Sequence, residues 1–172
     1  MEVHFDGHCF GCGQLNPDGL QMVFTPGPAG SACELEIPAR FQSWAGMVHG
    51  GMVSLMLDEA VGWAAWHAGH PGVTGRLAVA LRRPLKLGER VRVVGRVESV
   101  RRSLVYCSAV ISSAEAGDRI ADATATLMAT ETKGDVAGHE DLRSAPGRGG
   151  EPRAGGWHGP APFGSAHGSG AR

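Results

Sequence analysis

Polar and apolar residues alternate along five stretches of the chain, a period typical of β-strands with one buried face. The pattern is clearest over residues 89–102, where Val91, Val93 and Val97 alternate with charged residues. The inward-facing residues of the other stretches are Cys33, Leu35 and Ile37; Leu77, Val79 and Leu81; Val105, Cys107, Ala109 and Ile111; and Ala121, Ala123, Ala125 and Leu127. A further strand is predicted over residues 20–24. Short turns between consecutive strands favour antiparallel pairing.

Residues 50–66 follow a different pattern. They are apolar on every side of a helical projection, and a helix of that kind is buried on all sides. The order of strands, one buried helix and four more strands predicts an α+β fold whose antiparallel sheet wraps around the helix. One sheet covers only part of such a helix, so we expect its remaining apolar surface to contact a second subunit.

Glycine is concentrated towards the C-terminus. The chain has 172 residues with 27 glycines, and residues 134–172 are rich in glycine and proline and poor in large apolar side chains. So few apolar groups cannot offset the entropy lost on ordering the backbone. We therefore expect one folded domain over residues 1–133 and a disordered tail over residues 134–172.

The charges of the chain nearly cancel, with 16 Lys and Arg against 17 Asp and Glu. This balance gives no basic surface, so we expect neither nucleic acid nor a membrane as a partner. The N-terminus lacks the basic and apolar regions of a secretory signal, and the most apolar stretch is interrupted by His49, Asp58 and Glu59. We therefore expect a cytoplasmic protein with reduced cysteines.

The predicted helix begins at His49-Gly50-Gly51 and carries Asp58 and Glu59 in its middle. Free amides at a helix N-terminus can bind a carboxylate or a phosphate, or stabilise an oxyanion that develops on a carbonyl. A carboxylate in an apolar helix must be paired, protonated or used in chemistry. The alternative for Asp58 or Glu59 is a structural role, with hydrogen bonds at a subunit interface.

Gly50 and Asp58 are eight residues apart, which corresponds to about 12 Å along a helix. One carbonyl cannot contact both groups of the same chain. If they act together, each therefore comes from a different subunit, and the chemistry requires a dimer.

Three motifs carry a resemblance to a known family. They are HCFGCGQLNPDGLQM near the N-terminus, FQSWAGMVHGGMVSLMLDEAVGWA around the helix, and GVTGRLAVALRRPLKLGERVRVVGRV after it. An acidic residue nine positions after the histidine of His-Gly-Gly, followed by Thr-x-x-Leu and Arg-Arg-Pro, is much more specific than His-Gly-Gly alone. The sequence resembles the PaaI-like acyl-CoA thioesterases of the hotdog fold, in which an antiparallel sheet wraps one long central helix.

This resemblance implies roles for individual residues. Asp58 is implied as the nucleophile or general base, and the Gly50 amide as the group that polarises the thioester carbonyl. His49 is implied to shape the loop, and Thr74 to supply a hydroxyl sixteen residues after the acid. Many relatives carry an asparagine six residues before the histidine, where this chain has Ser43.

Substrate contacts are expected from Ser43, Gly51, Arg82 and Arg83. A guanidinium group pairs well with the phosphates of CoA. Arg82 and Arg83 are adjacent in a predicted strand, so they are expected on opposite faces, where at most one can serve a given pocket.

The function that the resemblance implies is hydrolysis of an acyl-CoA to a carboxylate and CoA, by a homodimer or a dimer of dimers. CoA is part of the substrate, and no cofactor is expected. One alternative is a noncatalytic acyl-CoA-binding or regulatory module. Another is a hotdog dehydratase or hydratase, although the Gly-Pro-containing loop of that branch is not found in the sequence.

Cys9 and Cys12, with His4 and His8 nearby, are four candidate zinc ligands. Structural zinc sites usually combine two separated ligand pairs, whereas these four residues lie within nine positions. We therefore expect no metal here. We interpret the two cysteines as part of a packed turn before the β-turn signal Asn-Pro-Asp-Gly.

Overall fold

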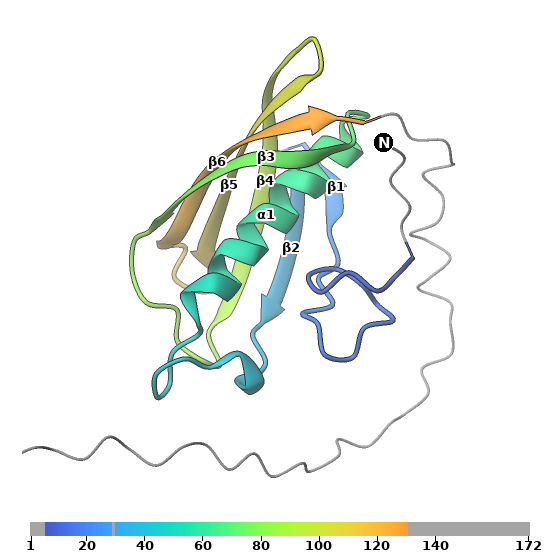
Figure 1. The fold of residues 1–172 in the computed structure, drawn as a ribbon. Coiled ribbons are helices and arrows are strands. Elements are labelled where there is room, and N and C mark those ends of the chain that lie inside the picture. The colour runs from blue at the N-terminus through green and yellow to red at the C-terminus, as the bar shows by residue number, and fades with distance from the viewer. Residues whose placement is uncertain (1–5, 29, 131–172) are drawn as a thin grey trace, which may run out of the picture.

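The computed structural model describes residues 6–28 and 30–130. In this part of the chain, six strands form one antiparallel sheet, and one long helix lies across a face of that sheet (Figure 1). This arrangement confirms the predicted α+β fold with a central helix. The tail predicted over residues 134–172 lies outside the described residues, as does His4.

The strands are β1 (Thr25–Gly27), β2 (Gly30–Glu36), β3 (Gly72–Leu81), β4 (Arg90–Arg101), β5 (Leu104–Ser113) and β6 (Arg119–Ala129). Their order in the sheet is β1-β2-β4-β5-β6-β3, so β1 and β3 are its edges. The helix α1 (Gly50–His67) follows a short 3-10 helix, η1 (Ala39–Phe41), and connects β2 to the far edge of the sheet.

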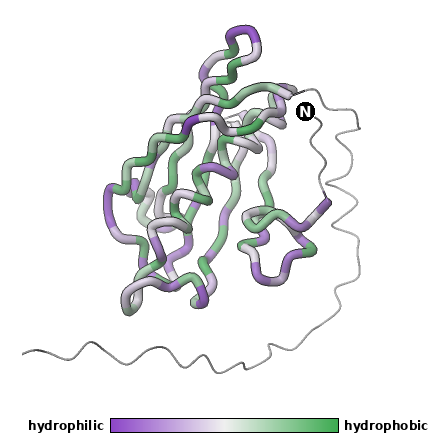
Figure 2. The backbone as a smooth tube through the Cα atoms, in the orientation of Figure 1, coloured by the Kyte–Doolittle hydropathy of each residue, from purple (hydrophilic) through white to green (hydrophobic). Residues whose placement is uncertain are grey.

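Eight of the eighteen residues of the helix are buried, and nine more are partly buried. Gly51 is its one exposed residue, and Met56, Leu57, Ala60 and Val61 are completely buried. Apolar residues therefore follow both the helix and the strands behind it (Figure 2). The sequence predicted this burial, because no side of the helix is polar.

Helix and sheet pack very closely at Gly95 of β4. A Cβ atom on Gly95 would lie 2.0 Å from the carbonyl oxygen of Ala60 in α1. Only glycine allows the helix backbone to pack directly on the strand at this point.

Most of the predicted strands are present in the described residues. The inward positions of β2, β4, β5 and β6 are buried or partly buried, as their alternation predicted. In β3 the same pattern is weaker, and Leu81 is 56% exposed. The reason is that β3 is an edge strand, with no neighbour beyond it in the chain.

The strand predicted over residues 20–24 is not found; instead β1 begins at Thr25. Leu20, Met22 and Phe24 are buried, so the apolar alternation identified core positions correctly. However, Gln21 has a positive φ of 51°, which interrupts an extended run. The N–H groups of Leu20 and Met22 donate to carbonyls of the N-terminal loop rather than to a strand. Alternation reports burial, and it does not by itself identify a hydrogen-bonding partner.

Candidate active site

His49 is the N-cap of α1. Its Nδ1 atom accepts a hydrogen bond from the N–H of Gly51 at 2.9 Å, which requires that nitrogen to be unprotonated. The N–H of Gly50, the first residue of the helix, has no acceptor in the part of the chain that the structure describes. His49 therefore satisfies the second amide of the helix and leaves the first one free.

This result divides the roles predicted for the two glycines. The Gly50 amide is available to a ligand, as the resemblance implied. The Gly51 amide donates to His49 within the chain, and its expected contact with a substrate stays a prediction. The sequence could not separate the two, because either amide of a Gly-Gly pair can face a capping side chain.

The loop before α1 is held from two sides. The N–H of His49 donates to the carbonyl of Phe41 at 3.0 Å, and the N–H of Val48 donates to that of Leu85 at 2.9 Å. These bonds fix the position of the free Gly50 amide. Beside it lies a cavity of about 630 Å³, which we call the Gly50 cavity. It is lined by Ser43, Trp44, Val48, His49, Gly50, Val53, Leu81, Arg82, Arg83, Pro84 and Leu85.

A second cavity, of about 320 Å³, lies against the middle of α1, and we call it the Asp58 cavity. It is lined by Cys9, Asp58, Glu59, Gly62, Trp63, Trp66, Pro71, Gly72 and Thr74. Asp58 Oδ1 is the one side-chain oxygen or nitrogen in residues 6–28 and 30–130 that is buried without a hydrogen-bond partner. An unsatisfied acceptor of this kind costs about 1–3 kcal/mol, which marks the carboxylate as a group without a structural purpose in the chain alone.

Thr74 reaches the Asp58 cavity from β3. The register between β3 and β6 shifts between Thr74 and Arg76, so Gly75 is an extra residue in the edge strand. Irregularities of this kind often redirect a side chain next to a functional site. The structure therefore brings Asp58 and Thr74 together, sixteen residues apart in sequence, as the resemblance implied.

The two cavities share no lining residue. Asp58 and Gly50 open into different cavities along the same helix, in agreement with their axial separation of about 12 Å. One chain thus carries the carboxylate and the free amide, but it does not bring them to one reacting carbonyl.

Arg82 and Arg83 both line the Gly50 cavity, so the expectation that at most one of them can serve a given pocket is wrong. β3 ends at Leu81, and the N–H groups of both arginines donate to the same carbonyl, that of Ile120. The alternation of side chains stops where the strand ends, and the arginine pair lies beyond that point.

Both guanidinium groups already have carboxylate partners. Arg82 forms two hydrogen bonds to Asp122, at 2.8 and 3.0 Å. Arg83 lies 2.6 Å from Asp118 and 2.6 Å from Glu89. The hydrogen bonds from Arg83 lower the pKa of Glu89 and of Asp118, and those from Arg82 lower the pKa of Asp122. A phosphate would have to compete with the exposed ion pairs to Asp122 and Asp118, which are individually weak, and with the partly buried Arg83–Glu89 pair.

The cysteine motif forms the predicted packed turn. The N–H of Gly13 donates to the carbonyl of Cys9, and the following Asn16–Gly19 turn closes with a 3.2 Å hydrogen bond. The turn packs against α1, where the Cys9 thiol donates to a carboxylate oxygen of Glu59 at 3.1 Å. Burial raises the pKa of the Cys12 thiol far above its usual value.

The lining of the Asp58 cavity also includes three residues that were not predicted there, Cys9, Glu59 and Trp63. Glu59 had one signal, because it directly follows Asp58 and so lies only about 100° around the helix from it. Cys9 had none, since no sequence pattern shows which element the N-terminal loop contacts.

The family model of the thioesterase superfamily matches residues 45–118, a range that contains all of α1 with Gly50 and Asp58. Among solved structures, a thioesterase superfamily protein is 24% identical, with a TM-score of 0.62 over 66% of this chain and 58% of that one. This chain thus spans less than two thirds of that protein. Zebrafish thioesterase superfamily member 2 is 20% identical, with a TM-score of 0.61 over 69% and 90% of the two chains.

The likeness to these solved structures shows that the chain has the hotdog fold. A hypothetical thioesterase of Streptococcus pneumoniae, crystallised with coenzyme A, shares this hotdog fold at 18% identity, with a TM-score of 0.61 over 66% and 91% of the chains. Two further crystal structures of that protein carry an alanine in place of an aspartate and of a threonine, which are sixteen positions apart. The curated proteins gave no significant match. Among the described residues, no helix combines the length and apolarity needed to cross a membrane.

Proposed function

We propose that this protein hydrolyses acyl-CoA thioesters, with Asp58 as the nucleophile or general base. The observation that supports the proposal most directly is the environment of the Asp58 carboxylate. One of its oxygens is buried without a hydrogen-bond partner, and the residue lines a cavity together with the Thr74 hydroxyl. A thioester needs little further machinery, because the thiolate of CoA is a good leaving group.

In the nucleophilic form of the reaction, an Asp58 oxygen attacks the thioester carbon, the C–S bond breaks, and CoA leaves as a thiolate. Water then hydrolyses the mixed anhydride to the free acid. In the general-base form, Asp58 takes a proton from a water molecule that attacks the carbon directly. In both forms the Gly50 N–H donates to the carbonyl oxygen as it gains negative charge, and Thr74 orients the water or the carboxylate.

The amide and the carboxylate act together only if two copies of the chain combine. β3 is an edge strand, with Thr74 near its beginning and Leu81 at its end. Thr74 lines the Asp58 cavity and Leu81 lines the Gly50 cavity. Antiparallel pairing of β3 with its copy would bring the beginning of one strand beside the end of the other. The Asp58 cavity of each subunit would then adjoin the Gly50 cavity of its partner.

The comparisons add two points in favour of this proposal. A structural neighbour binds coenzyme A, which supports CoA as the common part of the substrate. The aspartate and threonine replaced in that neighbour have the same spacing as Asp58 and Thr74. We further propose that the chain belongs to the PaaI-like group, on the three motifs given above.

Activity is tested by incubating the full chain with a panel of acyl-CoAs and measuring free CoA thiol and free acid together. Release of both supports the proposal. Hydration of an enoyl-CoA without thiol release would instead show a hydratase, and tight binding without turnover would show a binding module. Either result would refute thioester hydrolysis.

The shared site is tested by mixing two inactive variants. Gly50→Pro removes the N–H and keeps the helix, because proline is favoured at the first helical position and His49 already has the extended ψ of 133° that a following proline requires. Asp58→Asn removes the base. Random heterodimers of the two variants would contain one intact site in two, so the mixture should recover about a quarter of the wild-type rate. No recovery after verified subunit exchange would place both groups of a site in one chain.

A further inference from the structure

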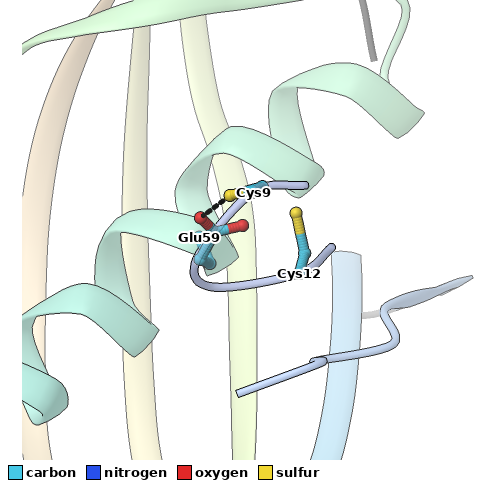
Figure 3. Close-up of side chains that lie close together, drawn as sticks. All are labelled: Cys9, Cys12 and Glu59. Carbon is cyan, nitrogen blue, oxygen red and sulfur yellow. Dashed lines mark hydrogen bonds between the residues drawn. The ribbon is translucent and has the colours of Figure 1, made fainter. Parts of the chain in front are cut away.

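Three side chains with metal-ligating atoms converge next to the Asp58 cavity. They are Cys9 and Cys12, from the N-terminal turn, and Glu59, from the middle of α1 (Figure 3). One ligand atom of each residue lies within 4.8 Å of those of the other two. The turn and the helix are distant in sequence, so only the fold creates this cluster.

The backbone around the cluster is closely packed. The N–H of Gly13 donates to the carbonyl of Cys9, and the N–H of Met22 donates to the carbonyl of Gly11. A Cβ atom on Gly11 would lie 2.4 Å from the Glu59 carboxyl carbon, so the turn lies directly on that carboxylate. Figure 3 shows the side chains of Cys9 and Cys12 beside the Glu59 carboxylate, with a hydrogen bond from Cys9. The turn thereby holds three candidate ligands in place before any ion binds.

A packed turn alone does not explain the chemistry of these groups. Glu59 is half-buried, and its carboxylate interacts with the thiols of Cys9 and Cys12, which are weak donors. A carboxylate placed against two thiols loses hydration and gains little in return. Cys12 is 3% exposed, so its sulfur is almost withdrawn from water as well. A cation would stabilise all three groups at once.

We propose that Cys9, Cys12 and Glu59 bind one divalent cation of the zinc class. Thiolate sulfur and carboxylate oxygen are ligands that Zn²⁺ accepts together, whereas Mg²⁺ and Ca²⁺ prefer oxygen alone. On binding, the two thiols release their protons to solvent and the carboxylate keeps its charge. Three protein ligands leave one of four tetrahedral positions for water or another ligand.

The site adjoins the proposed active site and does not depend on it. Cys9 and Glu59 also line the Asp58 cavity, so the ion would lie in the wall of that cavity. The predicted absence of metal considered the cysteines with His4 and His8, which all lie close together in sequence. The structure adds Glu59, and His8 is exposed, so the ligand set differs from the one that the sequence suggested.

The test is a titration of the full chain, reduced and freed of metal, with Zn²⁺ or Co²⁺ alone. We expect one ion per chain, and with Co²⁺ the intense sulfur-to-cobalt charge-transfer absorption that only thiolate ligation produces. This spectrum uses the wild-type protein, so it needs no variant to fold. No thioester is present, so the outcome is independent of the proposed hydrolysis.

Variants assign the ligands. Cys9→Ser, Cys12→Ser and Glu59→Gln should each weaken binding at least about tenfold. The control is Cys107→Ser, which removes an equally buried thiol from β5 outside the cluster and should leave the affinity unchanged. Circular dichroism establishes that each variant is folded. If a cysteine variant is not folded, Glu59→Gln, which preserves the shape of the side chain, decides the assignment.

Several results would overturn the metal site. They are the absence of a bound ion, a Co²⁺ spectrum without charge transfer, and an affinity of Cys9→Ser or Glu59→Gln equal to that of Cys107→Ser. Mass spectrometry of protein purified without reductant provides a further test of the metal site. A Cys9–Cys12 disulfide with no metal in that protein would assign the pair to redox chemistry instead.

Discussion

Replacement of Asp58 by asparagine separates chemistry from stability at the proposed active site. The change is almost isosteric, and it removes the negative charge together with the ability to attack a carbonyl or to accept a proton. A positioned general base contributes about 10²- to 10⁴-fold to a rate. At about 1.36 kcal/mol for each factor of ten, this corresponds to a loss of roughly 3–5 kcal/mol of transition-state stabilisation.

The stability of this variant should move in the opposite direction. Asp58 Oδ1 is buried without a donor, so the native protein bears the cost of an unsatisfied charged acceptor. An amide costs less to bury than a carboxylate, and removing such an acceptor recovers up to about 1–3 kcal/mol. We therefore expect Asp58→Asn to unfold at the same or a higher urea concentration than the wild type.

The assay is kcat/KM for the best acyl-CoA of the panel, combined with urea unfolding of the same preparations. The matched control is Asp18→Asn, which makes the same chemical change at an exposed turn and should alter neither quantity. A rate for Asp58→Asn within a few-fold of the wild type would remove Asp58 from the mechanism. A loss of rate accompanied by a comparable loss of stability would show instead that the carboxylate is structural.

Three further predictions follow from individual contacts. Thr74→Ala should lower kcat/KM by roughly fivefold, because one hydrogen bond of about 1 kcal/mol is lost, and an unchanged rate would make the hydroxyl structural. Gly95→Ala should destabilise the protein by about 1–3 kcal/mol or more in urea unfolding, because its Cβ would overlap the backbone of α1. The control Gly62→Ala, whose Cβ would meet nothing within 4 Å, should stabilise the protein by about 0.5–1 kcal/mol. Equal effects of the two variants would contradict the close contact at Gly95. Arg83 lowers the pKa of Glu89 below its unfolded value of about 4, so their interaction stabilises the native protein at neutral pH and loses this effect as the pH falls. The melting temperatures of the wild type and Arg83→Gln should therefore differ most at neutral pH and converge in acid. A difference that stays constant with pH would refute this linkage.

The site was predicted unevenly from the sequence. The His-Gly-Gly motif begins α1, as the local pattern predicted, and Asp58 and Thr74 line one cavity. The catalytic roles implied for these residues stay predictions. Gly51 and the arginine pair were harder to place, because their roles depend on hydrogen bonds to His49 and on where β3 ends. Both are outcomes of packing between segments, which a period along one segment does not contain.

The sequence by itself determined the helix, most of the strands and most of the buried positions of this protein. Periods of two and 3.6 residues decide which side chains leave water, and that choice depends mostly on the segment concerned. The tertiary structure alone decided which distant groups meet. Residues 20–24 are not a strand, because their N–H groups bond to the N-terminal loop. The Gly50 and Asp58 cavities lie at separate positions along one helix. The tertiary structure also brought two cysteines against Glu59 across about fifty residues of chain. Such contacts arise from the path of the whole backbone around α1, so no local pattern could specify them.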